Sequence, residues 1–222
     1  CNSSCLTTKG AGPLVKKTFS AGKFSSISTS LNAHIFISEG LVHSIDIKGQ
    51  QNILNILNVS NKEGVLEIDF ASACGAMSYD ELQVYITLPQ LAGIEITGSG
   101  TAESTDTLHV DKLNIDITGS ANVNATIVSH NTITGNITGS GDVTLKGVCD
   151  SEDFEITGSG NFHAFDLSCV SSRVDISGSG DAEVNVSKEL NTDISGSGSV
   201  KYKGNPAVNA NTSGSGTVTH VD

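Results

Sequence analysis

Apolar and polar residues alternate along the second half of the chain, and a short Gly-Ser-Gly motif interrupts the alternation at regular intervals. Two residues before the first glycine of each motif stands an isoleucine in six copies and a threonine in the seventh. A polar residue always separates this position from a second, mostly apolar position further back. A period of two is that of a β-strand with one buried face, so the pattern predicts a strand that ends at each glycine. The inward column nearest the turn consists of Ile96, Ile117, Ile137, Ile156, Ile176, Ile194 and Thr212.

A second alternating run follows every turn, and its apolar positions begin four residues after the first glycine, as at Val123 and Val143. The first glycines recur every 18 to 21 residues, and no segment of residues 94–222 shows helical periodicity. Repeats of this length with two strands each are typical of a β-solenoid, and parallel crossovers favour right-handed winding. We therefore expect an all-β fold, a right-handed parallel β-helix with coils of about 20 residues over residues 94–222.

The turn motif contains two glycines with different requirements. The first is present in all seven copies, whereas the second is replaced once, by Ala121. This difference indicates that the first glycine needs a positive φ and the second mainly a small side chain. A threonine or serine precedes every turn, and we interpret this hydroxyl ladder as structural rather than nucleophilic. The predicted turn residues are Gly98, Gly119, Gly139, Gly158, Gly178, Gly196 and Gly214.

The first part of the chain is less regular. Residues 18–93 contain longer alternating runs, for example at residues 33–37 and 82–86. Because a solenoid needs a cover over its apolar end, we expect an N-terminal β region or cap that is continuous with the repeats. Residues 1–17 have the character of an N-terminal tether.

Charge and hydropathy exclude two classes of protein. Among 222 residues, 24 Asp and Glu stand against 12 Lys and Arg, which gives a net charge of −12. Nucleic-acid binding needs clustered cations, so we expect no nucleic-acid partner. Apolar runs are only a few residues long, far below the roughly 20 needed to span a bilayer as a helix.

Cysteines point to the cell envelope. The chain opens Cys1-Asn2-Ser3-Ser4, which resembles a mature bacterial lipoprotein whose first cysteine carries lipid. The alternative is a boundary that falls at a cysteine by chance. With Cys1 as the lipid attachment residue, four of the five cysteines remain, and an even number fits an oxidising compartment.

A column of acidic residues is expected on the outer face. It reads Glu95, Asp116, Asn136, Glu155, Asp175, Asp193 and Asn211. Calcium binding and glycosidase chemistry are two interpretations of such stacked carboxylates, and a solvated face that blocks lateral aggregation is the third. We favour the solvated face, because salt screens the repulsion and the ligand arrangement matches no calcium motif.

Parallel β-helices often carry polysaccharide lyases, so catalysis needs separate evidence from the site. Lyase chemistry would require cations near the acids, yet Arg173 is the sole arginine and stands two residues before Asp175, where a surface ion pair explains it. There is no tryptophan, and Phe154, Phe162 and Tyr202 fall in inward columns. The sequence therefore predicts no catalytic residue, no metal ligand and no cofactor.

Three potential metal ligands share one offset. His130, Cys149 and Cys169 each lie nine residues before the next first glycine. Three donors on successive coils would span about twice the strand spacing, which is too far for one zinc ion. We expect Cys149 and Cys169 to be neighbours, either bonded as a disulfide or stacked as buried thiols.

The repeated Ile-Thr-Gly-Ser-Gly and Ile-Ser-Gly-Ser-Gly segments, together with the lead-in at residues 82–91, resemble a known family. It is the putative autotransporter adhesin, head "GIN" domain family of bacterial envelope proteins, and the resemblance covers most of residues 19–222. It implies a β-helix of pectin-lyase-like appearance without recognised catalytic residues, a role in cell adhesion, and an origin of Bacteroidetes type.

These observations lead to one hypothesis and one alternative. We expect a non-enzymatic outer-membrane lipoprotein, on the periplasmic or the surface-exposed side, whose strand faces serve adhesion or scaffolding. Its partner would be a protein or glycan surface, and the membrane would be reached only through the N-terminal lipid. The alternative is a polysaccharide-binding or polysaccharide-degrading protein.

Overall fold

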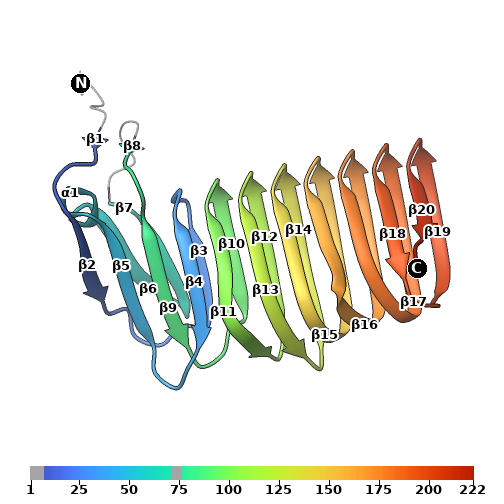
Figure 1. The fold of residues 1–222 in the computed structure, drawn as a ribbon, viewed down its shortest axis with the longest axis horizontal. Helices are drawn as coiled ribbons and strands as arrows, with labels where there is room; N and C mark the ends of the chain where they lie inside the picture. Colours follow the sequence, from blue (N-terminus) through green and yellow to red (C-terminus); the bar gives the residue numbers. More distant parts are fainter. Residues whose placement is uncertain (1–7, 72–76) are drawn as a thin grey trace.

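The computed structural model describes residues 8–71 and 77–222. The chain winds into a parallel β-solenoid of about six turns with roughly 20 residues each, and its coils stack side by side along the long axis of the molecule (Figure 1). Seven glycine turns thus delimit about six coils. The expected parallel β-helix is confirmed, and no helix in the described residues is long and apolar enough to cross a membrane.

One sheet, here called face A, contains the strand segments that end at the glycine turns. Each segment pairs in parallel with its equivalent in the next coil. Face A is formed by β10 (Gly93–Gly98), β12 (Leu113–Gly119), β14 (Thr132–Gly139), the second parts of β15 (Asp142–Gly158), β16 (Asn161–Gly178) and β17 (Asp181–Gly196), and β19 (Ala207–Gly214).

The opposite sheet, face B, contains the segments that follow the turns, and these also pair in parallel. It is formed by β11 (Thr101–Val110), β13 (Asn122–Ser129), the first parts of β15, β16 and β17, then β18 (Ser199–Lys203) and β20 (Thr217–His220). Strands β15 to β17 are long because each continues from face B through the bend into face A as one strand, although the pairing between coils shifts register near the bend.

The isoleucine column lies between the two faces. Ile96 pairs with Ile117, and the register continues through Ile194 to Thr212. All six isoleucines are at most 1% exposed, as the alternation predicts. Thr212 belongs to the last coil, where β19 is exposed along its whole length.

The turns meet the requirement predicted for the first glycine. All seven first glycines have φ between 117° and 134°. The amide of the serine that follows donates to the glycine carbonyl of the preceding coil, over 2.7 to 2.9 Å in the six turns from Ser120 to Ser215. The serine amides of these six turns are therefore satisfied by backbone carbonyls rather than by the hydroxyl ladder.

The second glycine is more restricted than the sequence indicates. A Cβ at Gly141 would lie 2.3 Å from the carbonyl oxygen of Ala121, and one at Gly139 would lie 2.3 Å from that of Gly119. Both glycines thus allow close stacking of successive turns, and the positive φ is the requirement that only the first glycine has.

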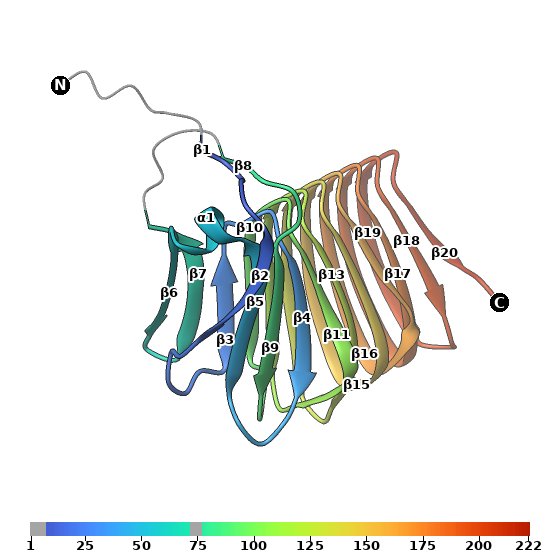
Figure 2. The same cartoon turned by 60° about the vertical axis from the view of Figure 1, so that its left-hand side comes forward.

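The N-terminal region extends both faces with antiparallel strands. On face B, β2 (Leu14–Phe19) pairs with β5 (Ser44–Gln50), which pairs with β9 (Gln83–Leu88). On face A, β6 (Leu57–Lys62) pairs with β7 (Val65–Phe70). The short α1 (Gln51–Leu54) brings Ile53 and Leu54 into the core at this end of the molecule (Figure 2).

A coil built from an earlier part of the chain joins this region to the repeats. Strand β3 (Ser26–Thr29) lies between β7 and β10, and β4 (His34–Glu39) lies between β9 and β11. The short β1 (Thr8–Lys9) pairs with β8 (Met77–Ser78). Residues 8–9 and 14–17 therefore belong to sheets, which differs from the tether expected over residues 1–17. Alternation in β2 is weak because most of its residues are exposed.

Candidate functional site

The acidic column on the outside of face A has the predicted register. Glu95 pairs with Asp116. Further along the column, Glu155 pairs with Asp175, which pairs with Asp193. The two asparagines of the column donate to neighbouring aspartates, Asn136 to Asp116 over 2.8 Å and Asn211 to Asp193 over 3.1 Å. These hydrogen bonds link adjacent coils, and in the described residues no three of these carboxylates lie within 4.8 Å of one another. The arrangement supports a solvated outer face.

A groove of about 330 Å³ lies over the middle of this column, lined by residues that include Asp153, Glu155, Arg173 and Asp175. The Arg173 guanidinium donates to Asp175 over 2.6 and 3.0 Å and lies 3.8 Å from Asp153. Its hydrogen bond and charge attraction to Asp175 raise the pKa of Arg173 further above its usual range. The cation is thus already paired with carboxylates, as the sequence interpretation of Arg173 expected.

An aromatic cluster occupies the outside of face B near the N-terminal end. The Phe36 ring stacks with the His34 ring at 4.1 Å and with the Tyr85 ring at 4.9 Å between ring centroids. Glu103 Oε2 lies 3.1 Å from His34 Nε2, and Tyr85 is 37% exposed. This cluster was not predicted from the sequence, in which only the inward aromatic residues had been assigned. Its signal is the alternation itself, because Phe36 and Tyr85 each stand between two inward residues.

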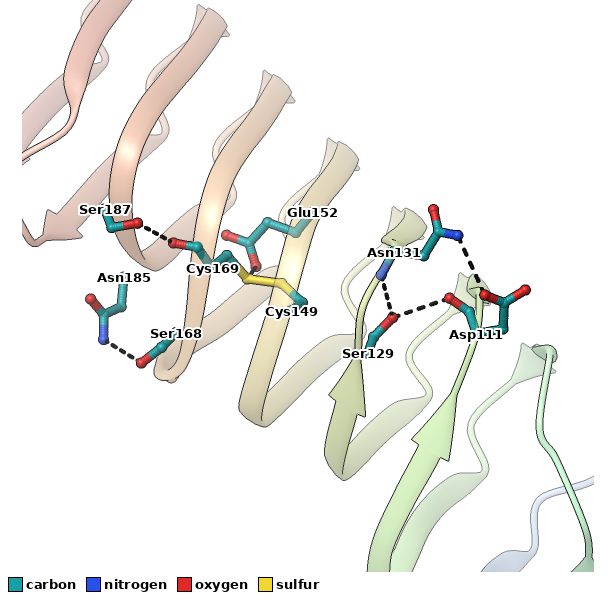
Figure 3. The surroundings of a disulfide bond; sticks show 9 residues. All are labelled: Asp111, Ser129, Asn131, Cys149, Glu152, Ser168, Cys169, Asn185 and Ser187. Carbon is teal, nitrogen blue, oxygen red and sulfur yellow. Dashed lines mark hydrogen bonds between the residues drawn. A yellow bond between two sulfur atoms is a disulfide. The ribbon is translucent and has the colours of Figure 1, made fainter.

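A third cluster lies inside the solenoid, where the chain bends from face B into face A (Figure 3). Cys149 and Cys169 pair in register with their α-carbons 4.7 Å apart, and their sulfur atoms form a disulfide. Both residues are 4% exposed. The two cysteines are therefore neighbours, as predicted from their equal distance in sequence to the next first glycine.

His130 does not belong to this column. Val128 pairs with Val148, so Ser129 occupies the inward position that corresponds to Cys149, and Ser129 is 1% exposed. Its hydroxyl donates to the carbonyl of Asp111 over 3.1 Å. His130 is exposed, because the bend of its coil contains one residue more than the bend that follows. The shared column of three residues was therefore wrong for His130.

Glu152 completes the inner cluster, and it was not predicted from the sequence. Its side chain is 0% exposed, and Oε2 lies 3.6 Å from Cys169 Sγ. Burial raises the pKa of Glu152 from 4.5 to about 8, and the Ser172 hydroxyl opposes this shift. The sequence did contain a signal for its position. Glu152 precedes Phe154 by two residues and Ile156 by four, and this even spacing from inward residues places it on the inward face of the strand.

Comparison with known proteins assigns this chain to a protein family. Residues 23–206 match the family model described as putative auto-transporter adhesin, head GIN domain. The chain belongs to this family. A search of functionally curated proteins found no match. The predicted lipid attachment residue, Cys1, lies outside the described residues.

Solved structures share the fold over nearly their whole length. A putative adhesin from Bacteroides fragilis is 23% identical with a TM-score of 0.87, covering 96% of this chain and 100% of that one. A putative lipid binding protein from Parabacteroides distasonis is 20% identical with a TM-score of 0.82, covering 98% and 100%. A putative adhesin from the same species is 26% identical with a TM-score of 0.71, covering 97% and 100%.

Proposed function

We propose that this GIN-domain protein is a non-enzymatic adhesin of the cell envelope, which binds its partner through the outer faces of the solenoid. The observation that carries the proposal is the long series of in-register polar side chains on face A, whose one arginine is already paired with Asp175 and Asp153. Such a face offers many repeated contacts along the solenoid. A lyase would instead need a cation free to stabilise negative charge that develops on the substrate.

Anchoring completes the proposal. Lipid on Cys1 would hold the protein at the outer membrane through its N-terminal segment. Expression of the full precursor in a Bacteroidetes host tests this part. The wild-type protein should incorporate radiolabelled fatty acid and appear in the membrane fraction, whereas Cys1→Ser should lose the label. A Cys1→Ser protein that remains labelled would contradict the anchor.

The binding function is tested on purified protein coated on beads. Glycan arrays and immobilised host matrix proteins should retain the beads in a saturable manner. Two variants separate the faces, Glu155→Gln with Asp175→Asn on face A, and Phe36→Ser with Tyr85→Ser on face B. We expect one of them to weaken binding at least tenfold with unchanged circular dichroism. If the beads bind none of the tested surfaces in a saturable manner, the adhesin proposal is overturned. If the protein converts the glycans into shortened or unsaturated sugars, the non-enzymatic part of the proposal is overturned.

Polysaccharide binding is a second candidate, favoured by the outward aromatic cluster. Phe36 and Tyr85 lie beside Glu103 and Gln83, and Tyr85 donates to Gln83 over 2.9 Å. Aromatic rings with neighbouring polar groups are suited to sugar binding. If the face B variant alone loses binding, and only polysaccharides compete with the beads, this second function is the correct one.

A further inference from the structure

The interior of the solenoid contains a group of residues that a purely structural core does not need. The Cys149 and Cys169 sulfurs and a Glu152 carboxylate oxygen all lie within 4.8 Å of one another. In the described part of the chain, this is the one group of three histidine, cysteine or acidic residues with such close ligand atoms. Figure 3 shows the Glu152 side chain directed toward the disulfide.

Apart from the cystine, the one polar side chain that acts on Glu152 is the Ser172 hydroxyl, which lowers its pKa less than burial raises it. Its register neighbours are Ile133 on one side and Ser172 on the other. Glu152 Oε1 and Ser172 Oγ are both buried without a hydrogen-bond partner. The nearby Cys169 sulfur carries no proton while it is bonded to Cys149. Buried polar groups are nearly always paired, so a buried carboxyl group with one unpaired oxygen beside two cysteine sulfurs indicates a ligand that is bound in another state of the protein.

We propose that reduction of the Cys149–Cys169 disulfide creates a buried site for a thiophilic divalent cation of the zinc type, with the two sulfurs and the Glu152 carboxylate as ligands. Zinc binds thiolate at about 2.3 Å and carboxylate at about 2.0 to 2.2 Å. Ligand atoms around one ion are then nearly 4 Å apart, a spacing within reach of groups that already lie within 4.8 Å.

This set differs from the three-coil column that the sequence suggested. Glu152 follows Cys149 by three residues in the same coil, so the three ligands span two adjacent coils instead of three. The distance objection therefore does not apply. Ser172, the register neighbour of Glu152, would be available to donate to the carboxylate oxygen that does not bind the metal, in the manner of a second-shell residue.

The chemistry couples the redox state of the cysteines to the site. A phosphine reductant, with one water molecule, converts the disulfide into two thiols and becomes a phosphine oxide. The cation then replaces three protons, two from the thiols and one from the Glu152 carboxyl. Reoxidation to the disulfide withdraws both sulfur ligands, so the oxidised protein has no affinity at this site.

Cobalt titration tests the site directly. The protein is reduced with a phosphine under argon, freed of reductant, and titrated with Co²⁺, which reports thiolate ligation by a charge-transfer band in the near ultraviolet. We expect one equivalent to bind and Zn²⁺ to displace it. Glu152→Gln should weaken binding at least tenfold, whereas Glu155→Gln, the matched change on the outside of the same strand, should leave it unchanged. The oxidised protein should give no band.

Two results would overturn the proposal. One is a reduced protein that keeps its β-sheet circular dichroism and shows no stoichiometric band, and the other is equal affinity in Glu152→Gln and Glu155→Gln. If reduction alone unfolds the chain, the reduced protein is refolded with and without Zn²⁺ and treated with an alkylating agent. Protection of Cys149 and Cys169 only in the presence of zinc then supports the site, and equal alkylation overturns it.

Discussion

A buried carboxyl group beside Ile133, Ser172 and a cystine lowers the stability of the folded protein whenever it is ionised. For Glu152, burial raises the pKa from 4.5 to about 8, since the charged form loses its hydration. The folded state therefore retains this proton at pH values where the unfolded chain has released it. Between these two pKa values the folded state binds more protons, so its stability falls as the pH rises.

Glu152→Gln should remove this pH dependence in the disulfide form. Below pH 4.5 the variant and the wild type should have similar free energies of unfolding, because the carboxyl is protonated in both states of the wild type. Above pH 8 the variant should be more stable by an amount on the order of 5 kcal/mol. Urea unfolding at pH 4, 6, 7 and 9 measures the difference. A difference that stays constant over this series would show that Glu152 does not titrate as described.

The two turn glycines provide a matched pair of substitutions. In Gly139→Ala and Gly141→Ala the new Cβ would lie 2.3 Å from a carbonyl oxygen of the preceding turn. Only Gly139 also has a positive φ, of 122°. Because this backbone conformation is strained for any residue with a Cβ, Gly139→Ala should be the more destabilising by about 1 kcal/mol or more. Chemical denaturation compares the two, and equal midpoints would contradict the role given to φ.

At the scale of the element, the inward faces of neighbouring coils are fitted to each other by volume. Gly135 lies in an inward column between Ile115 and Phe154. The Phe154 ring stacks on Phe162 at 3.7 Å and fills the space that a side chain at Gly135 would occupy. A glycine in the middle of a strand weakens it, and here the space left for an aromatic ring explains its presence.

A double-mutant cycle tests this fit. In Gly135→Ala the new Cβ would lie 2.1 Å from Phe154 Cε1, and such overpacking costs about 1 to 3 kcal/mol. Phe154→Leu alone should destabilise by leaving a cavity. The double variant should be more stable than the sum of the two effects by about 1 kcal/mol or more, because leucine makes room for the alanine. Simple additivity in urea unfolding would indicate that the ring and Gly135 are not coupled.

The disulfide should stabilise the bend between coils. It closes a loop with a sequence separation of 20, and a loop of this size is worth roughly 3 kcal/mol. Alkylation of denatured, unreduced protein followed by peptide mapping should leave Cys149 and Cys169 unmodified. Cys149→Ser with Cys169→Ser should lower the free energy of unfolding by a similar amount. Full alkylation of both cysteines before reduction would show that the bond is not formed.

At the scale of the whole molecule, sequence predicts the solenoid well because parallel stacking places equivalent residues in columns. Alignment on the first glycine was sufficient to predict the buried isoleucines and the acidic ladder, since pairing runs through these positions without a shift. It failed at the bend before Ile133, where a coil with one extra residue moves His130 outward and Ser129 inward. In the N-terminal region, β5 and β6 reverse direction, and antiparallel pairing leaves no repeat to align.

Glu152 shows a different limit. Its inward position could be read from the alternation, but a charged residue at an inward position conflicts with the usual composition of a core. The groove around Arg173 depends on rotamers that bring its guanidinium to Asp175 and Asp153. Columns predict which residues are neighbours, and they do not predict which hydrogen bonds those neighbours make.

The modular architecture predicts that one whole coil can be removed. Each coil contacts mainly its two neighbours, so stability is close to a sum of local terms. Deletion of residues 179–196 removes 18 residues between equivalent turn positions and joins Gly178 directly to Ser197. The Gly-Ser-Gly turn is preserved, and Val200 comes to lie against Phe162, where Ala182 lies now. The shortened protein should keep its β-sheet circular dichroism and a cooperative unfolding transition.

Deletion of residues 179–195 is the control, since it differs by one residue. With Gly196 retained, every residue after the junction is shifted by one position, and a shift of one turns inward side chains outward. Val200 would then face solvent and Ser199 the core. Limited proteolysis with mass spectrometry should show protected C-terminal coils in the first deletion and cleavage after residue 196 in the second. Equal protection of both variants would mean that the columns do not hold the coils in register.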